Sequence, residues 1–244
     1  INLDAAMFTL DQDVSLKGNV IYANAVGMQN SGKEVVVMQG GSGVRIAKKT
    51  IYQADWFQEE MHIVELSETK EELPSQPKLL DALLMGIRDF DSQVFGGRVP
   101  WIVGMSGGLD SSVTAALLCA ALGKERVYGY NIATQHNSST TISNAAKEAQ
   151  ALGIHYKEGN MKSLIQASAE LLRQEYGYDV EEMPSLVMEN LQARSRGYLL
   201  SGFAGILGGV VVNNGNKVET ALGYCTLYGD SIGALSVIGD LTKV

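Results

Sequence analysis

The spacing of apolar and polar positions changes along the chain near residue 75. Before that point, short apolar runs are separated by glycines, and after it, longer apolar stretches recur with helical spacing. The short runs over 20–23, 35–39 and 63–66 predict β-strands. Residues 67–78 are polar and charged and hold two of the four prolines, which is typical of a linker. The sequence therefore predicts a β-rich first part and a separate, larger second part.

The second part alternates between strand and helix patterns. Helices are predicted over 79–90, 111–122, 139–152, 161–176 and 184–208, and buried strands over 99–105, 127–133, 154–157 and 209–213. Glycines at 123 and 153 follow two of these helices, as is common at helix C-termini. Such alternation favours an α/β fold, a doubly wound parallel sheet with helices on both faces.

Composition and charge exclude several classes of protein. The 244 residues are 45% hydrophobic, and 19 basic against 27 acidic residues give a net charge of −8. An acidic chain repels a phosphate backbone, so no nucleic-acid partner is expected. The longest mainly apolar stretch, 199–212, is too short to span a bilayer, and no signal-peptide pattern opens the chain. Cys119 lies in an apolar run, which fits a reducing compartment, so we expect a cytoplasmic protein without membrane association.

The first chemical candidate is Ser106-Gly107-Gly108-Leu109-Asp110-Ser111-Ser112, which lies between a predicted strand and a predicted helix. Its glycines allow close approach of a ligand, and its amides with the helix N-terminus suit an anion such as pyrophosphate. Asp110 would be repelled by phosphate unless a divalent cation lies between them, which makes it a candidate magnesium ligand. The alternative is that Asp110 and Ser111 only cap a helix. The loop is neither a Walker nor a Rossmann pattern, and it closely resembles the pyrophosphate loop of ATP pyrophosphatases.

Three further segments carry candidate chemistry. Asn213-Asn214-Gly215-Asn216-Lys217-Val218-Glu219 follows the last predicted strand; it is either an ordinary Asn-Gly turn or a site where Lys217 holds an anion and Glu219 shares the metal of Asp110. Glu189-Asn190-Leu191-Gln192-Ala193-Arg194-Ser195-Arg196 is either a polar helix face or a place where guanidinium groups are ion-paired or bind a ligand. Gly223-Tyr224-Cys225-Thr226-Leu227-Tyr228-Gly229-Asp230 taken alone is a glycine-rich loop.

Taken together and in this order, these segments strongly resemble NAD synthetase, over about residues 78–244. The resemblance implies the Rossmann-like adenine nucleotide alpha hydrolase fold and a carbon–nitrogen ligase that uses ATP and magnesium. It implies amidation of deamido-NAD to NAD through an adenylated nicotinate carboxylate, with release of AMP and pyrophosphate. Ammonia is the nitrogen donor, supplied by glutamine in the full-length enzyme. A homodimer or higher homo-oligomer is also expected from the family.

The resemblance also implies roles for individual residues. Asp110, Lys217 and Glu219 are expected to be catalytic, with magnesium on Asp110 and Glu219. Lys217 would face deamido-NAD together with Asn190 and Arg194, and Lys243 would contact ATP. Nucleotide and substrate contacts are expected at Gly104, Ser106, Gly107, Gly108, Asp110, Ser111, Ser112, Asn190, Arg194, Asn214, Lys217, Glu219 and Lys243. The chain departs from the family pattern at Asn214, where the family has Thr, and at Ile132-Ala133, where it has Met-Pro.

The first part resembles the end of a nitrilase-like glutaminase domain. The resemblance rests on Tyr22-Ala23-Asn24-Ala25-Val26-Gly27 and Gly40-Gly41-Ser42. It implies a glutaminase segment over 1–73 and a synthetase domain over 74–244 that is truncated at its C-terminus. The family's glutaminase nucleophile is a cysteine, and residues 1–73 contain none, so no working glutaminase is expected from this part.

Two alternatives stay open. The chain could be another pyrophosphate-loop ligase, such as a GMP synthetase or a tRNA-modifying enzyme, although the acidic balance and the Asn-Lys-x-Glu turn count against these. It could also be a catalytically silent nucleotide-binding or assembly domain. The histidines His62, His136 and His155 are far apart in the sequence and lack ligand spacing, so we interpret them as surface or structural residues.

Overall fold

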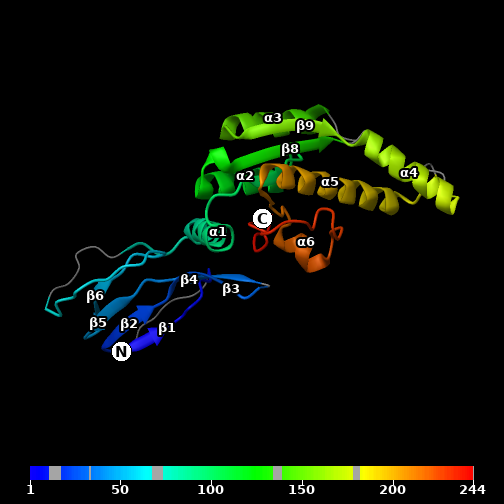
Figure 1. Cartoon of the computed structure of the whole chain (residues 1–244). Coiled ribbons are helices and arrows are strands. Elements are labelled where there is room, and N and C mark those ends of the chain that lie inside the picture. Colours follow the sequence, from blue (N-terminus) through cyan, green and yellow to red (C-terminus); the bar gives the residue numbers. More distant parts are fainter. Residues whose placement is uncertain (11–17, 33, 68–73, 134–138, 178–181, 244) are drawn as a thin grey trace. The chain divides into compact units, whose positions relative to one another are not determined.

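The computed structural model describes residues 1–10, 18–32, 34–67, 74–133, 139–177 and 182–243 (Figure 1). Its contacts divide the chain into two compact units, Ile1–Gly97 and Arg98–Val244. The predicted linker over 67–78 lies partly outside the described residues. The predicted domain boundary after residue 73 falls at the end of these undescribed residues and stays a prediction.

The first unit consists of short strands and one helix. One sheet has the strand order β1-β2-β5-β6, and β3 and β4 form a separate antiparallel pair. The bounds are β1 (Asn2–Asp4), β2 (Val20–Asn24), β3 (Val26–Asn30), β4 (Val35–Gln39), β5 (Gly43–Ile46) and β6 (Lys49–Gln53). The strands predicted over 20–23 and 35–39 are confirmed. The strand predicted over 63–66 is wrong, because these residues pair with no strand in the described part of the chain and Ile63 is 92% exposed.

Helix α1 (Leu79–Phe95) packs on β3 and β4 within the first unit. It buries Ala82, Ile87 and Phe90 on one face, which confirms the helical spacing of apolar residues. On the neighbouring turn, the Asp89 carboxylate accepts a hydrogen bond from the Met28 amide at 2.9 Å. This helix therefore completes the core of the first unit.

The second unit is built on a parallel sheet with the strand order β10-β7-β8-β9. The bounds are β7 (Trp101–Gly104), β8 (Val127–Ala133), β9 (His155–Asn160) and β10 (Val210–Val211). Trp101, Ile102 and Val103 are fully buried, as expected for a central strand that is covered on both faces. The four predicted strands are confirmed, with shifts of one to three residues at some ends.

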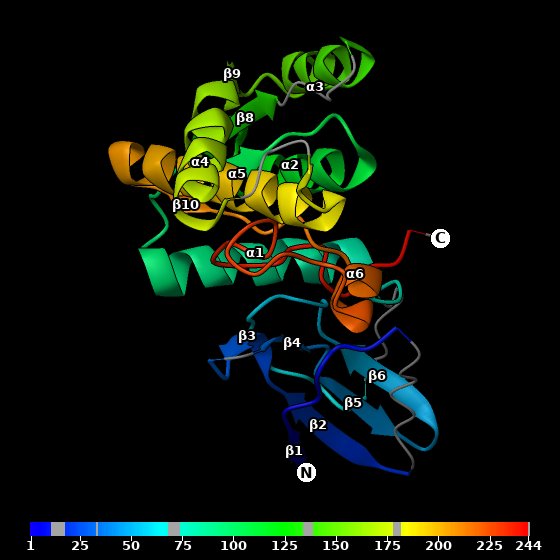
Figure 2. The ribbon, with the colours of Figure 1, turned by 90° about the vertical axis from the view of Figure 1, so that its right-hand side faces the viewer.

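Helices cover both faces of this sheet (Figure 2). The bounds are α2 (Leu109–Leu122), α3 (Ser139–Leu152), α4 (Lys162–Tyr176) and α5 (Ser185–Leu207), with a 3₁₀ turn at Lys124–Arg126. Right-handed crossovers place α2 and α3 on one face and α4 and α5 on the other. On the second face, Tyr130 of β8 stacks on Phe203 of α5, with ring centroids 4.4 Å apart. The predicted doubly wound α/β fold is thus confirmed, and no helix in the described part of the chain is long and apolar enough to cross a membrane.

The order of the strands determines where a ligand can bind. From β7 the chain builds outward through β8 to β9, then returns across the sheet so that β10 lies on the other side of β7. Such a reversal opens a crevice at the carboxyl ends of the two strands beside it. The loop after β7 starts at Met105, and the segment after β10 starts at Val212, so the first and second candidate motifs meet at this crevice.

A short helix, α6 (Lys217–Leu222), lies where the sequence predicted only a turn over 213–219. The Asn216 side chain accepts hydrogen bonds from the amides of Val218 at 2.9 Å and Glu219 at 3.1 Å. In return, Glu219 Oε2 accepts from the Asn216 amide at 3.1 Å. This is a capping box, and its Asn-x-x-Glu spacing is a helix-start signal that neither the turn nor the ligand-site interpretation of this segment took into account.

Candidate functional site

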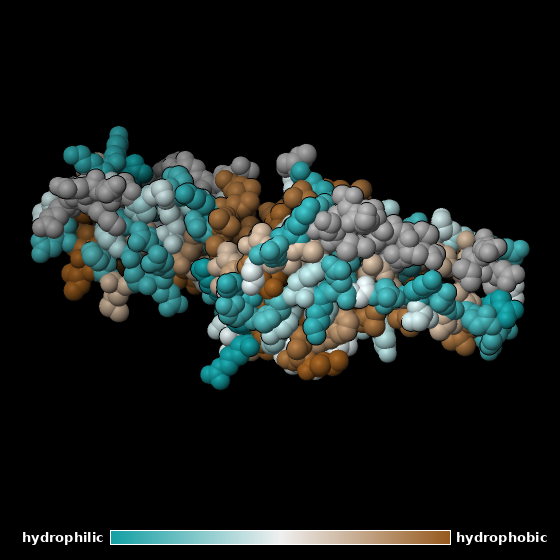
Figure 3. Space-filling view, turned by 90° about the horizontal axis from the view of Figure 1, so that it is seen from above, coloured by the Kyte–Doolittle hydropathy of each residue, from teal (hydrophilic) through white to brown (hydrophobic). Residues whose placement is uncertain are grey.

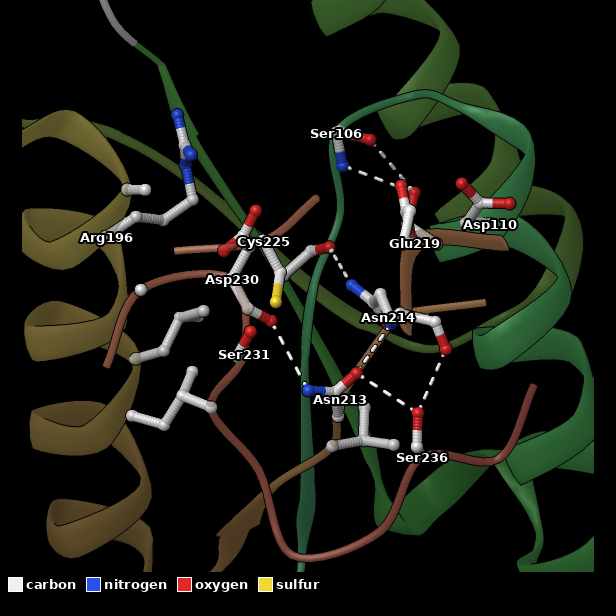
Figure 4. A pocket seen from close by; sticks show the side chains of 18 of the residues that line it. Ser106, Asp110, Arg196, Asn213, Asn214, Glu219, Cys225, Asp230, Ser231 and Ser236 are labelled. Atoms are coloured by element: carbon white, nitrogen blue, oxygen red, sulfur yellow. Dashed lines mark hydrogen bonds between the residues drawn. The ribbon is translucent and has the colours of Figure 1, made fainter. Parts of the chain in front are cut away.

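A pocket of about 520 Å³ lies at the carboxyl ends of β7, β8 and β10 (Figure 4). Four segments that are far apart in the sequence form its walls: the end of β7 with the following loop and the first turn of α2, the end of β8, helix α5, and the stretch from Val212 to Ser236. The lining residues are Gly104, Met105, Ser106, Asp110, Ser111, Tyr130, Asn131, Ile132, Ala193, Arg196, Leu200, Val212, Asn213, Asn214, Gly215, Glu219, Thr220, Tyr224, Cys225, Gly229, Asp230, Ser231, Ile232 and Ser236.

The loop after β7 is held in shape by its own serines. Ser111 Oγ accepts a hydrogen bond from the Ser106 amide at 3.3 Å and donates to the Gly108 carbonyl at 3.0 Å. Ser112 Oγ also donates to that carbonyl, at 2.7 Å. Gly107 has a φ of 77°, a left-handed conformation that glycine adopts without strain. The N-cap of α2 is Gly108, without a side-chain hydrogen bond, so Asp110 and Ser111 do not act as the N-cap that the structural alternative required.

Asn214 joins the two strand ends that form the crevice. Its Nδ2 donates to the Gly104 carbonyl at 2.8 Å, and its buried Oδ1 has no hydrogen-bond partner among the described residues. Gly104 is closely packed, because an added Cβ would lie 3.0 Å from Leu200 Cδ1. Beside it, Asn213 Oδ1 accepts from the Gly215 amide at 2.6 Å and from Ser236 Oγ at 3.1 Å. The second motif is thus fixed against the first by side-chain amides.

Two carboxylates that line the pocket, Asp110 and Glu219, act electrostatically on the ammonium group of Lys243. Lys243 Nζ lies 2.8 Å from Asp110 Oδ2. The hydrogen bond and charge of Asp110 raise the pKa of Lys243, and the charge of Glu219 adds to this effect. Asp110 and Glu219, from α2 and α6, both line the pocket, and their sharing of one metal ion stays a prediction.

Two residues of the Glu189–Arg196 segment hold the Gly223–Asp230 segment in place. Thr226 Oγ1 donates to Asn190 Oδ1 at 2.7 Å, and Arg194 Nε donates to the Leu227 carbonyl at 3.2 Å. The backbones also approach closely, because a Cβ added to Gly229 would lie 2.9 Å from the Ala193 carbonyl carbon. Helix α5 therefore positions the loop whose residues Cys225, Gly229, Asp230 and Ser231 line the pocket.

Arg196 is the one cationic side chain among the described residues that line the pocket. It extends from α5, on the opposite side of the view from Ser106, Asp110 and Glu219 (Figure 4). Burial lowers the pKa of its guanidinium, and the charge of Asp230 opposes that shift. A desolvated cation at one end of the pocket faces a carboxylate pair at the other.

The pocket brings together part of the predicted set of site residues. Gly104, Ser106, Asp110, Ser111, Asn214 and Glu219 line it. Lys243 contacts one of these, Asp110, without lining the pocket itself. The remaining predicted residues lie outside the pocket wall: Gly107, Gly108, Ser112, Asn190, Arg194 and Lys217. Lys217 is exposed and is the first residue of α6.

The predicted site list omitted several residues that the structure brings to the pocket. Tyr224, Cys225 and Asp230 belong to the segment Gly223–Asp230, for which no individual roles were predicted, so membership of that motif was the signal that could have identified them. Tyr130 and Asn131 come from the end of β8, where no motif marks them. His62 and His155 stack on Tyr52 and Tyr128, which are packing roles, and His136 lies outside the described residues.

Comparison with known proteins agrees with this site. A sequence model of the NAD synthase family matches residues 95–244. The chain is 34% identical over 238 residues to the glutamine-dependent NAD(+) synthetase of Synechocystis sp. This alignment covers 92% of this chain and 40% of that protein. It is 37% identical over 142 residues to the NH(3)-dependent NAD(+) synthetase of Methanococcoides burtonii, covering 58% of this chain and 52% of that protein.

A solved structure of an NAD+ synthetase is also similar to this chain. The glutamine-dependent NAD+ synthetase of Acinetobacter baumannii, in complex with adenosine diphosphate, superposes with a TM-score of 0.83 at 31% identity. The match covers 92% of this chain and 43% of that one, so the chain spans about two fifths of the length of such relatives. With the family match extending over the parallel sheet and the whole pocket, the chain belongs to the NAD synthase family.

Proposed function

We propose that this chain catalyses ATP-dependent amidation of deamido-NAD to NAD, with ammonia as the nitrogen donor. The observation that carries the proposal is the crevice between β7 and β10. There the pyrophosphate-type loop, Asp110 and Glu219 line one pocket, although they come from distant parts of the sequence. The names of the glutamine-dependent and NH(3)-dependent relatives support the same reaction.

In this proposal the loop after β7 holds the phosphates of ATP. The first amides of α2 have no intrahelical partner, and the helix dipole favours negative charge at that end. The left-handed Gly107 and the serine hydrogen bonds fix the direction of these amides before a ligand arrives. Preorganised donors of this kind stabilise the departing pyrophosphate without further reorganisation.

We infer a magnesium site at Asp110 and Glu219, and the donor set fits this ion. Magnesium prefers oxygen ligands and commonly takes one or two carboxylates, with phosphates and water completing the shell. Such a site needs no cluster of three ligands, and none is found among His, Cys, Asp and Glu in the described residues. When bound, the ion would neutralise charge on the phosphates of ATP. Lys243 beside Asp110 adds a second positive charge at the same place.

Most of the chain's work in this reaction is positioning and charge neutralisation. The carboxylate of deamido-NAD attacks the α-phosphorus of ATP, pyrophosphate leaves, and ammonia then displaces AMP from the activated carbonyl. No step in this sequence needs a side-chain nucleophile. Holding two substrates in line contributes through effective concentration, which is large for well-oriented groups.

We also propose the finer properties that the family suggests. The enzyme works in the cytoplasm as a homodimer or higher homo-oligomer. Lys217, Asn190 and Arg194 face deamido-NAD when it is bound. The glutaminase segment ends at residue 73, and ammonia reaches the site from another source when glutamine is not hydrolysed by the same chain.

The deciding experiment is incubation of the purified chain with ATP, magnesium, ammonium and deamido-NAD, followed by chromatography of the nucleotides. We expect NAD and AMP to form in equal amounts, and omission of ammonium to remove NAD. Nucleotide binding without turnover would identify a silent domain. AMP formation with another acceptor, such as xanthosine monophosphate, and none with deamido-NAD would identify another pyrophosphate-loop ligase.

A further inference from the structure

One face of helix α5 forms a wall of the pocket that combines apolar groups with a single cation. Ala193, Arg196 and Leu200 all line the pocket, and their spacing of three and four residues places them on one side of the helix. In Figure 4 the Arg196 guanidinium reaches from α5, whereas Ser106 and Asp110 lie on the other side of the view. The pocket therefore has a phosphate-loop side and an α5 side.

The Arg196 guanidinium has no hydrogen bond and no ion pair within 4.0 Å among the described residues; its one electrostatic partner there is Asp230, at longer range. Arg194, two residues away, differs from Arg196. It is exposed, and its Nε donates a hydrogen bond to the Leu227 carbonyl. A guanidinium carries five N–H donors and holds its charge at all ordinary pH values. Because a buried charge without a hydrogen bond is costly, the unused donors of Arg196 favour an anionic ligand on the α5 side of the pocket.

The surroundings of Arg196 restrict what this anion is. Leu200 and Ile232 are apolar, and Ala193 and Gly229 are small, so this side of the pocket suits a flat, weakly polar ring. An arginine fork binds a carboxylate through two parallel hydrogen bonds. Phosphate groups have their own donors in the loop after β7 and the N-terminus of α2, on the other side of the pocket.

We propose that Arg196 binds the carboxylate of the aromatic acyl substrate, with the ring against Ala193 and Leu200. The inference rests on the proposed function, because it names the side of the pocket where the carboxylate to be amidated is held. Five donors are enough for Arg196 to serve this carboxylate and to remain near Asp230. The product carries a neutral carboxamide in place of the carboxylate, so Arg196 favours binding of the substrate over binding of the product.

The test is a comparison of two ligands that differ only at this group, deamido-NAD and NAD. Titration calorimetry on the purified chain measures the affinity of each without ATP, for the wild type and for Arg196→Gln. The wild type should bind deamido-NAD more tightly than NAD. The variant should lose about 10- to 100-fold in affinity for deamido-NAD, the scale of a hydrogen bond to a charged group, and little for NAD.

Further variants and ligands separate this role from others. Arg173→Gln removes the same charge from an exposed position on α4 and should leave both affinities unchanged. Arg196→Lys keeps the charge but not the fork, so its preference for deamido-NAD should be intermediate, and melting temperatures show whether the variants fold. ADP should bind to Arg196→Gln as it does to the wild type.

Several outcomes would overturn the inference. Equal losses for deamido-NAD and NAD would place Arg196 on a phosphate of the dinucleotide, and a loss for ADP would place it on ATP. A wild type that binds NAD as tightly as deamido-NAD would exclude a carboxylate contact without any variant. If the wild type makes NAD while the preference is absent, only this inference fails, whereas a chain that neither binds deamido-NAD nor makes NAD contradicts the proposed function itself.

Discussion

The Asn214 side chain both joins two strand ends by a hydrogen bond and lines the pocket. Its Nδ2 donates across the crevice to the Gly104 carbonyl, so the segment after β10 is hydrogen-bonded to the end of β7. In Asn214→Asp the donor is replaced by a carboxylate oxygen opposite a carbonyl oxygen. We expect a loss of about 1–3 kcal/mol in the free energy of unfolding, measured by urea denaturation, and weaker ATP binding by calorimetry. Asn160→Asp is the control, because Oδ1 of that exposed residue is an acceptor, and no change in either quantity is expected there.

Asp110 is the residue on which the proposed metal site depends most. It lies in the first turn of α2, lines the pocket and pairs with Lys243. Asp110→Asn keeps the size of the side chain but removes its charge, so magnesium loses a ligand and Lys243 loses its partner. We expect the rate of AMP formation to fall by about 10²–10³ and the magnesium concentration for half-maximal rate to rise. Asp240→Asn, at an exposed carboxylate near Lys243, should change neither, and an unaltered magnesium dependence in Asp110→Asn would reject the assignment.

At the scale of elements, the capping box of α6 links helix stability to a candidate ligand. Asn216 is 2% exposed and its side chain holds the amide of Glu219, whose carboxylate is held in return. Asn216→Ala should lower the free energy of unfolding by about 0.5–2 kcal/mol and weaken binding of Mn²⁺, used as a spectroscopic substitute for magnesium. Asn216→Asp retains the accepting oxygen and should restore both. Lost stability with unchanged Mn²⁺ binding would show that Glu219 is not a ligand.

The sequence predicted the elements of the second unit well, because long apolar stretches separated by glycines leave few alternatives. It missed α6, since six residues give little periodicity and the Asn-x-x-Glu signal also fits a ligand motif. It wrongly made a strand of 63–66, because an apolar run predicts a strand only if a partner is present to pair with it. A short apolar run does not indicate which other strand it would pair with, so wrongly predicted strands are expected in the first unit, where such runs are common.

The site was predictable where a motif follows a strand directly, and less so where a side chain turns away from the pocket. The loop after β7 and the segment after β10 meet as their positions at strand ends predicted. Asn190 and Arg194 belong to an equally clear motif, but their side chains bond to the loop around Thr226 and Leu227. Arg196, on the same helix, lines the pocket instead. Which face of a helix meets a ligand depends on packing against segments that are distant in sequence.

For the whole molecule, the cysteine content of residues 1–73 leads to a prediction about which nitrogen donor this chain uses. Residues 1–73 include no cysteine, the residue that the resembled glutaminases use as nucleophile. We expect NAD formation by this chain with ammonium and none above background with glutamine, measured under otherwise identical conditions. Addition of a separate glutaminase should restore the glutamine reaction by releasing ammonia. Equal rates with glutamine and ammonium in the absence of that enzyme would contradict the expectation.

The exposed apolar surface of the second unit predicts that the chain associates with further copies of itself. Several large apolar side chains of α5, of the end of α6 and of the segment after it are exposed: Leu186, Val187, Tyr198, Ile206, Leu222, Tyr224, Leu227 and Tyr228. On the face displayed in Figure 3, hydrophobic residues interrupt a largely hydrophilic surface. Exposed apolar groups on neighbouring segments commonly mark an interface between chains, and Tyr228 is 81% exposed.

Sedimentation at micromolar concentration should therefore give a dimer or larger oligomer. Tyr198 is 69% exposed on α5, away from the pocket lining, so Tyr198→Glu would place a charge in such an interface without altering the pocket. Burying an unpaired charge costs several kcal/mol, so this variant should shift the chain toward monomer. Tyr176→Glu, at a residue 72% exposed near the end of α4, is the matched control and should leave the oligomeric state unchanged. A wild-type chain that sediments as a monomer and is fully active would contradict the predicted assembly.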